Sequence, residues 1–318
     1  MSNTQFIETN ETVIVTSGSA YIDIDVLACS LALSYLHRLC GIESIACHTG
    51  KMNGTIPESV KVEVYDLFEK TLPCSGRFKY ALVDVSNPRY FESFVDHEKI
   101  IEVYDHHFGF EKYWKDKLGK FVQISHVGSC ATLIWEKYVK LEKVHQLPES
   151  IAKLLYLAIV SNTLNLKAFV TTDRDIEAKI GIEKLGFFES ELITEYYSHI
   201  EYQLLNDFKN VLLNDVKTHD WKGEDCFIGQ LEMLDSEEII ETYFLTGTAT
   251  KYIKDKYATN GQLWFVVISD IKKGYNFIFT ENKKTKRLIE RNFSFTFDGN
   301  FAKSDRLWMR KEFIRDMS

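Results

Sequence analysis

The chain has little that would take it out of the cell or into a membrane. It contains no uncharged apolar run of about 18 residues, the length that a spanning helix needs. The first residues, Met1–Phe6, carry neither a basic flank nor a long apolar stretch. None of the six cysteines forms a Cys-x-x-Cys pair, so they are interpreted as reduced thiols of the core. We therefore expect a cytoplasmic protein that is neither exported nor inserted into a membrane.

Positive charge is also in short supply. The 318 residues include 38 Lys and Arg against 46 Asp and Glu, which gives a formal net charge of −8. This balance argues against nucleic acid as the main partner, but it leaves room for a local basic pocket that binds an anionic substrate. The content of 45% hydrophobic and 26% charged residues is ordinary for a globular protein. The length predicts two domains, each able to bury a core.

Acidic residues follow three apolar runs, each of which is typical of a buried strand. The three combinations are Thr12–Thr16 before Asp23-x-Asp25, Tyr80–Val83 before Asp84, and Ile100–Tyr104 before Asp105-His106-His107. Since ligands of open α/β sheets bind at the carboxyl ends of parallel strands, we expect these side chains on one rim. Carboxylates so close together repel one another, and a divalent cation is the simplest way to relieve that repulsion. The pattern therefore predicts a metal centre.

Parts of this pattern also have a simpler interpretation. An Asp in the loop that enters a helix is commonly an N-cap, and we weigh this role equally with metal binding for Asp23 and Asp25. Taken alone, Asp105-His106-His107 could be a surface turn that contains two histidines. The repetition of the pattern at three strand ends favours the metal centre.

The predicted fold class is α/β, with a doubly wound parallel sheet in residues 1–190 and a smaller mixed α/β domain in residues 191–318. The boundary falls in a helical stretch, 175–213, that contains no proline. β-Rich segments follow, with a helical stretch at 239–257 between the first two. The predicted strands of the second domain are Phe227–Leu231, Leu263–Ile268, Tyr275–Phe279 and Phe293–Phe297.

These motifs resemble those of the DHH phosphoesterases, specifically the branch that contains manganese-dependent (family II) inorganic pyrophosphatases and prune-like exopolyphosphatases. The similar motifs run in order over most of the chain. In the first domain they are Asp23-x-Asp25, Asp84, Asp105-His106-His107, Gly128–Thr132 and Ser161–Lys167. In the second domain, which resembles a DHHA2-type domain, they are Asp215-Val-Lys217, Ile228–Gln230 and Met309-Arg310-Lys311.

The resemblance implies a site for up to two divalent ions, Mn²⁺ or alternatively Mg²⁺ or Co²⁺. The implied metal ligands are Asp23, Asp25, Asp84 and His106, with Asp84 bridging the two ions. Two further ligand positions of the pyrophosphatases hold other residues here, since Ser19 stands for a histidine and Asn162 for an aspartate. The exchange removes one imidazole and one negative charge, so weaker metal binding is expected.

By the same resemblance, His107 contacts the substrate phosphate, and Asp105 orients the loop or a ligand. With Asp84, these two residues make up the expected catalytic group. Lys217, Arg310 and Lys311 reach in from the second domain to hold phosphate, Arg through its bidentate fork and Lys as a point charge. Without the resemblance, these three cations would be assigned to a solvated surface.

The leading hypothesis is a divalent-metal-dependent hydrolase that cleaves phosphoanhydride bonds of pyrophosphate or short-chain polyphosphate with a two-metal-activated water. The alternatives are an impaired family member that binds a phosphorylated ligand or a protein partner, and a phosphoesterase that acts on a nucleotide. We expect a small phosphorylated substrate as the partner, and we expect no binding to nucleic acid or to a membrane. The sequence is compatible with a homodimer.

Overall fold

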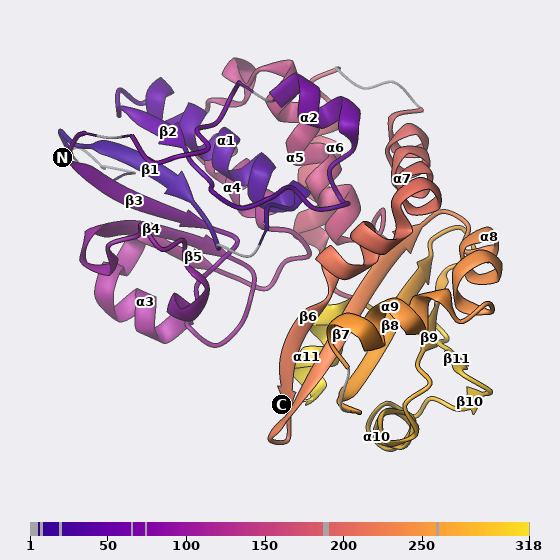
Figure 1. Ribbon diagram of the computed structural model, residues 1–318. Coiled ribbons are helices and arrows are strands. Elements are labelled where there is room, and N and C mark those ends of the chain that lie inside the picture. Colours follow the sequence, from indigo (N-terminus) through magenta and orange to yellow (C-terminus); the bar gives the residue numbers. More distant parts are fainter. Residues whose placement is uncertain are drawn as a thin grey trace. The chain divides into compact units, whose positions relative to one another are not determined.

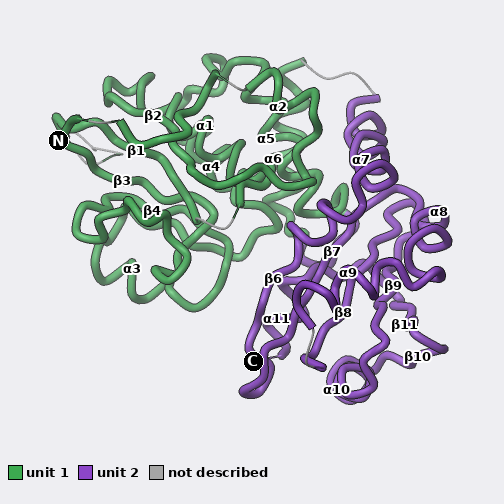
Figure 2. Tube along the Cα trace, viewed as in Figure 1, with its two compact units in different colours: residues 1–166, 171–190 green, residues 167–170, 191–318 purple. Residues whose placement is uncertain are grey.

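The chain divides into two compact units, which Figure 2 shows in separate colours. The computed structural model describes residues 6, 9–18, 21–64, 66–73, 75–186, 191–258 and 261–317. Unit 1 comprises residues 1–166 and 171–190, and unit 2 comprises residues 167–170 and 191–318. The short segment 167–170 belongs to unit 2, where Ala168 pairs with Leu307 in an isolated β-bridge. Within the described ranges, no helix is both long and apolar enough to span a membrane.

Unit 1 is built on a five-stranded parallel sheet (Figure 1). In spatial order its strands are β2 (Ser44–Ala46), β1 (Thr12–Thr16), β3 (Phe78–Val83), β4 (Ile100–Asp105) and β5 (Val122–Ile124). Each neighbouring pair is parallel, so the carboxyl ends of all strands meet at one edge. The winding of the chain reverses between β1 and β3, which is where sheets of this order bind their ligands.

Helices cover both faces of this sheet. On one face, α1 (Ile24–Leu39), α4 (Cys130–Lys140) and α5 (Glu149–Asn162) pack against one another, and α6 (Asp173–Glu183) contacts α4 and α5. Trp114 of α3 (Glu111–Leu118) packs with Leu82 and Val103 on the other face. The remaining helices are α2 (Glu58–Val64) and short 3₁₀ turns at Pro88–Tyr90, His97–Lys99, Gly119–Phe121 and Val144–Gln146. The doubly wound parallel sheet predicted from the sequence is confirmed.

Unit 2 contains a six-stranded sheet flanked by helices (Figure 1). In spatial order the strands are β10 (Phe297–Asp298), β11 (Phe301–Lys303), β9 (Tyr275–Phe279), β8 (Leu263–Asp270), β7 (Glu224–Met233) and β6 (Lys217–Trp221). Strands β7 and β8 run parallel and the other pairs are antiparallel, which confirms the predicted mixed sheet. The helices are α7 (Leu192–Asp215), α8 (Glu237–Ile239), a π-helical turn (Ile240–Phe244), α9 (Thr248–Lys256), α10 (Lys283–Phe293) and α11 (Arg310–Met317).

The predicted strand Phe293–Phe297 is wrong. Phe293 is the last residue of α10, and Ser294 closes that helix with a left-handed φ of +56°. Both Phe293 and Phe295 are buried in one core cluster with Phe313 of α11. The alternation of phenylalanines therefore comes from a helix end and a loop that share one core, and not from a pleated strand.

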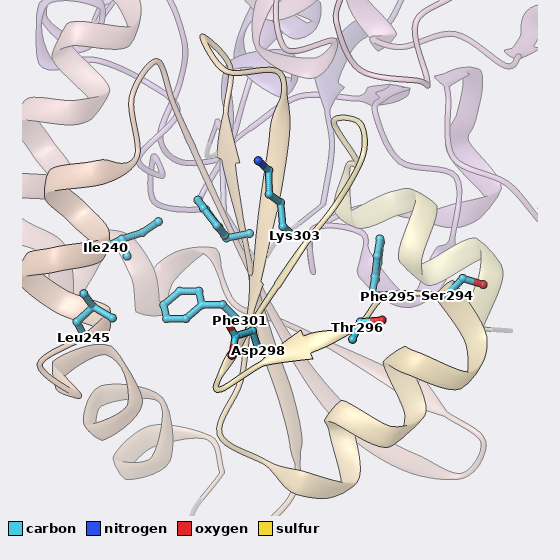
Figure 3. Close-up of a pocket in the computed structure, with 9 residues that line it drawn as sticks. Ile240, Leu245, Ser294, Phe295, Thr296, Asp298, Phe301 and Lys303 are labelled. Atoms are coloured by element: carbon cyan, nitrogen blue, oxygen red, sulfur yellow. The ribbon is translucent and has the colours of Figure 1, made fainter.

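An open pocket of about 580 Å³ lies beside this loop (Figure 3). Phe295 and Thr296 line one side, while Leu245 and Phe301 line the other. Asp298 and Lys303 are the ionisable residues among its lining side chains. The pocket thus combines aromatic surface with little charge, and it does not coincide with any residue predicted to be functional.

Candidate functional site

Asp84 follows β3 directly and turns the chain at the switch point between β1 and β3. Its φ of +55° lies in the left-handed region, which aspartate tolerates better than most residues. The backbone N–H still pairs with the sheet, donating to the Tyr104 carbonyl at 2.8 Å. This conformation places a carboxylate that is only 8% exposed at the edge of the sheet.

The Asp105-His106-His107 loop is held in place by its own aspartate. Asp105 Oδ1 accepts the backbone N–H of His106 at 2.7 Å and that of His107 at 3.1 Å, and it lies 2.8 Å from His107 Nδ1. His106 Nδ1 lies 3.3 Å from the Val127 carbonyl, which fixes the ring and leaves Nε2 facing Asp84. Metal-binding histidines commonly donate their other ring N–H to a carbonyl in this way.

Asp84, His106 and His107 can offer three ligand atoms to one ion. One donor atom of each residue lies within 4.8 Å of the other two. His106 Nε2 is 3.1 Å from Asp84 Oδ1, a spacing that lets both atoms reach a cation at about 2.1 Å. Although it is buried, Asp84 Oδ1 accepts no hydrogen bond from the described part of the chain. A buried oxygen without a donor, next to imidazole nitrogen, fits a divalent metal.

Asp25 is fully buried at the amino end of α4. Its carboxylate accepts hydrogen bonds from Ser129 Oγ at 3.0 Å and from the backbone N–H groups of Cys130 and Ala131 at 2.9 Å. The end of a helix where N–H groups are unpaired favours such a negative charge. Burial, and to a lesser degree the charge of Asp23, nevertheless raises the pKa of Asp25 to about 6. The carboxylate is thus held by hydrogen bonds, and none of the basic side chains in the described ranges forms an ion pair with it.

Asp23 is the N-cap of α1, as the simpler interpretation held. Its Oδ1 accepts the Val26 backbone N–H at 3.0 Å. The pKa of Asp84 is well above its usual value, mainly because Asp84 is buried and then because of the negative charges of Asp25 and Asp23. Asp23 therefore also acts electrostatically on Asp84. Asp23, Asp25, Asp84 and Asp105, here called the acidic rim, therefore lie close enough to feel one another's charge.

Asp175 supports this rim, although the sequence did not assign it a role. Its Oδ2 accepts the Gly128 backbone N–H at 2.8 Å, and it forms a capping box with Thr172 at the start of α6. No side chain fits at Gly128, because a Cβ there would lie 2.5 Å from Thr163 Cγ2. Asp175 thus fixes the loop that leads into α4, whose first N–H groups hold Asp25. The Thr172-x-x-Asp175 spacing was the available signal in the sequence.

Ser19 and Asn162 are the two positions at which the chain departs from the pyrophosphatase motifs. Ser19 lies outside the described residues. Asn162 ends α5, and its Nδ2 donates to the Ala158 carbonyl at 3.3 Å. Their roles as metal ligands stay predictions.

Unit 2 brings together the three predicted phosphate-binding residues. Lys217 opens β6, and Arg310 and Lys311 open α11; we call these three the basic cluster. Arg310 is only 9% exposed and donates to Asp215, with Nη1 at 2.6 Å from Oδ2 and Nη2 at 3.3 Å from Oδ1. Burial, followed by the charges of Arg310 and Lys311, lowers the pKa of Lys217 well below its usual value. The cations therefore act on one another, and Asp215 supplies a counter-charge that the sequence did not reveal.

Comparisons with known proteins agree with the motifs. No family model matches the chain. The chain is 25% identical over 228 residues to a probable manganese-dependent inorganic pyrophosphatase of Lactobacillus johnsonii, which covers 69% of this chain and 70% of the relative. It is 26% identical over 315 residues to a manganese-dependent inorganic pyrophosphatase of Methanocaldococcus jannaschii, which covers 91% of this chain and 93% of the relative.

A solved structure shows the same fold. The crystal structure of a putative family II inorganic pyrophosphatase from Methanococcus jannaschii superposes with a TM-score of 0.74 at 22% identity. The superposition covers 96% of this chain and 98% of that chain. The resemblance inferred from the motifs is therefore confirmed in sequence and in fold.

Proposed function

We propose that this chain is a divalent-metal-dependent hydrolase of phosphoanhydride bonds, with pyrophosphate or short-chain polyphosphate as its substrate. The observation that carries the proposal is the buried Asp84 Oδ1, which has no hydrogen-bond donor among the described residues and faces His106 Nε2 at 3.1 Å. The proteins to which the chain is similar are named manganese-dependent inorganic pyrophosphatases, which supports both the metal and the substrate.

The residues of unit 1 would hold the metal. Asp84 and His106 supply the core of a site for up to two Mn²⁺, Mg²⁺ or Co²⁺ ions. The remaining ligands are assigned to Asp23 and Asp25 and to the positions Ser19 and Asn162. When bound, such ions supply positive charge that activates water and stabilises the phosphoryl oxygens. Residues 1–190 then form the catalytic domain.

His107 would contact the substrate. Its ring is half exposed, and Nδ1 lies 2.8 Å from Asp105 Oδ1. This contact orients the imidazole so that Nε2 is the atom able to donate a proton to a phosphate oxygen. Asp105 therefore positions the loop, while Asp84 and His107 take the catalytic roles.

The basic cluster of unit 2 would bind the phosphate oxygens of the same substrate. A guanidinium and two ammonium groups match the negative charge that is spread over the phosphoryl oxygens in the transition state. Residues 191–318 then form the substrate-binding domain. In this proposal the protein acts in the cytoplasm on a small phosphorylated molecule, without nucleic acid, and a homodimer would be visible by light scattering.

Metal analysis of the purified protein, followed by assays of phosphate release, tests the proposal. Pyrophosphate, tripolyphosphate and long polyphosphate would each be offered with Mn²⁺, Co²⁺ or Mg²⁺. Metal-dependent release from pyrophosphate or tripolyphosphate is the expected result. If no substrate is cleaved with any of the three ions, the chain is a binding protein rather than an enzyme.

A further inference from the structure

A hydrogen-bonded network surrounds Arg310 in unit 2. Asp215, the last residue of α7, accepts from Arg310 Nη1 at 2.6 Å through Oδ2. Gln230 of β7 donates its backbone N–H to the same oxygen at 2.7 Å, and its side-chain Oε1 accepts the Arg310 backbone N–H. Asp215 of α7 thus holds the guanidinium group of Arg310, and Gln230 of β7 holds its backbone N–H, although both are distant from α11 in the sequence.

Glu232 extends this network along β7. The side-chain amide of Gln230 donates to Glu232 Oε1. Charged and titratable groups face this carboxyl from two further elements: Asp215 and Tyr197 on α7, and Arg310 and Lys311 on α11. Lys217 of β6 in turn interacts with Arg310 and Lys311. Glu232 is therefore linked both to the residue that holds Arg310 and to the charges of the basic cluster.

The charge of Glu232 changes in the neutral range. Burial, followed by the negative charge of Asp215, raises the pKa of Glu232 to about 7, although the Gln230 amide and the two neighbouring cations of α11 oppose that rise. Below this pH the basic cluster faces one carboxylate, and above it the cluster faces two. An added negative charge that acts on the cations of the cluster weakens their attraction for an anion.

We propose that Asp215 and Gln230 are positioning residues, which fix Arg310, and that Glu232 sets the net charge around the basic cluster, so that ionised Glu232 weakens phosphate binding. This role rests on the proposed function, in which the basic cluster holds the phosphates of the substrate. It extends that function by making affinity, rather than the chemical step, the quantity that responds to pH. Neutral Glu232 leaves the cluster in its tight-binding state.

Calorimetry of pyrophosphate binding tests this role in the full chain, without divalent ions so that no turnover occurs. The variants are Glu232→Gln, Glu232→Leu and the control Glu224→Gln, which removes an exposed carboxylate from the same strand. At pH 6 the wild type and both Glu232 variants should bind equally. At pH 8 the wild type should bind about three- to tenfold more weakly than either Glu232 variant, while the control follows the wild type. Because the variants are compared at the same pH, the ionisation state of pyrophosphate is the same for all of them.

Turnover in the presence of metal gives a second readout that a purely structural role would not move. Between pH 6 and 8, the change of KM in Glu232→Gln should be about three- to tenfold smaller than in the wild type, with similar changes of kcat in both. If wild type and variants share one pH profile of affinity, the role of Glu232 is overturned while the proposed function stands. If the wild type binds no pyrophosphate at either pH, the phosphate role of the basic cluster and this proposal both fail.

Discussion

The acidic rim of unit 1 and the basic cluster of unit 2 both crowd charges of one sign, but they balance them differently. The ion partners of Asp84 are two imidazoles, His106 Nε2 at 3.1 Å and His107 Nδ1 at 3.8 Å. In the basic cluster, Arg310 is paired with Asp215 from the same unit. Among the described residues the charge of Asp84 thus faces imidazoles alone, whereas Arg310 of the cluster already has a carboxylate counter-charge.

The largest expected effect comes from replacing Asp84. Asp84→Asn should reduce turnover to background and abolish Mn²⁺ binding, because a neutral amide oxygen is a poor substitute for a bridging carboxylate. Without metal, the same variant should melt at a higher temperature than the wild type, since it removes a buried charge that Asp25 and Asp23 repel. Asparagine also tolerates the left-handed φ of this position.

Thermal unfolding with and without Mn²⁺ tests both the higher melting temperature of the variant and its loss of metal binding. Added Mn²⁺ should raise the melting temperature of the wild type and leave that of Asp84→Asn unchanged. Asp116→Asn, which changes an exposed aspartate of the same unit, serves as the matched control. A variant that is stabilised by Mn²⁺ as strongly as the wild type would remove Asp84 from the metal site.

A substitution in the basic cluster should instead weaken the interaction with substrate and leave metal binding intact. Arg310→Ala should lower kcat/KM by an amount that corresponds to about 2–4 kcal/mol of transition-state stabilisation, by analogy with the loss of one preorganised donor. The affinity for Mn²⁺ should stay unchanged. Arg315→Ala is a matched control, because Arg315 lies on the same helix, is 46% exposed and pairs with Asp316. Full activity of Arg310→Ala on every substrate that the wild type cleaves would contradict the assignment.

His48 offers a third case, a buried imidazole whose pKa is shifted by burial alone. It lies just beyond β2, is 1% exposed, and neither ring nitrogen has a hydrogen-bond partner in the described part of the chain. Burial lowers the pKa of His48 to about 4, whereas an unfolded chain protonates this imidazole near pH 6.5. The contribution of His48 to stability is therefore complete above pH 6.5 and is lost as the pH falls towards 4.

Urea unfolding at several pH values quantifies this loss. Between pH 6.5 and 4 the wild type should lose about 2–3 kcal/mol more stability than His48→Leu, which cannot titrate. His145→Leu, at an exposed histidine of the same unit, should follow the wild type. Parallel profiles for wild type and His48→Leu would show that the folded chain protonates His48 as readily as the unfolded chain does.

The acidic rim could be predicted because its geometry follows from a simple rule. β1 begins and ends as expected, and β3 and β4 end in or just before their aspartates, so parallel pairing alone brings the acids to one edge. The carbonyl that orients His106 could not be predicted, since Val127 reaches it from a loop 21 residues away.

The contacts of Asp215 and Gln230 with Arg310 were missed for the same physical reason. Asp215 and Gln230 are 15 residues apart, and Arg310 follows Asp215 by 95 residues, so no local pattern connects them. The wrong strand at Phe293–Phe297 shows the related limit of periodicity. A spacing of two between buried phenylalanines reports a shared core, but it does not distinguish a strand from a helix end followed by a loop.

The smallest expected effect concerns the two positions that depart from the pyrophosphatases. Ser19→His with Asn162→Asp adds an imidazole and a carboxylate, so calorimetry should show Mn²⁺ binding about tenfold tighter than in the wild type, a gain of about 1.4 kcal/mol. The Asn162→Asp change alone replaces an amide that donates to Ala158 at the carboxyl end of α5, where a negative charge is unfavourable. This single variant should therefore melt lower than the wild type without metal and recover when Mn²⁺ is added. If the double variant binds Mn²⁺ no more tightly than the wild type, neither position belongs to the metal site, and the acidic rim alone determines the affinity for metal.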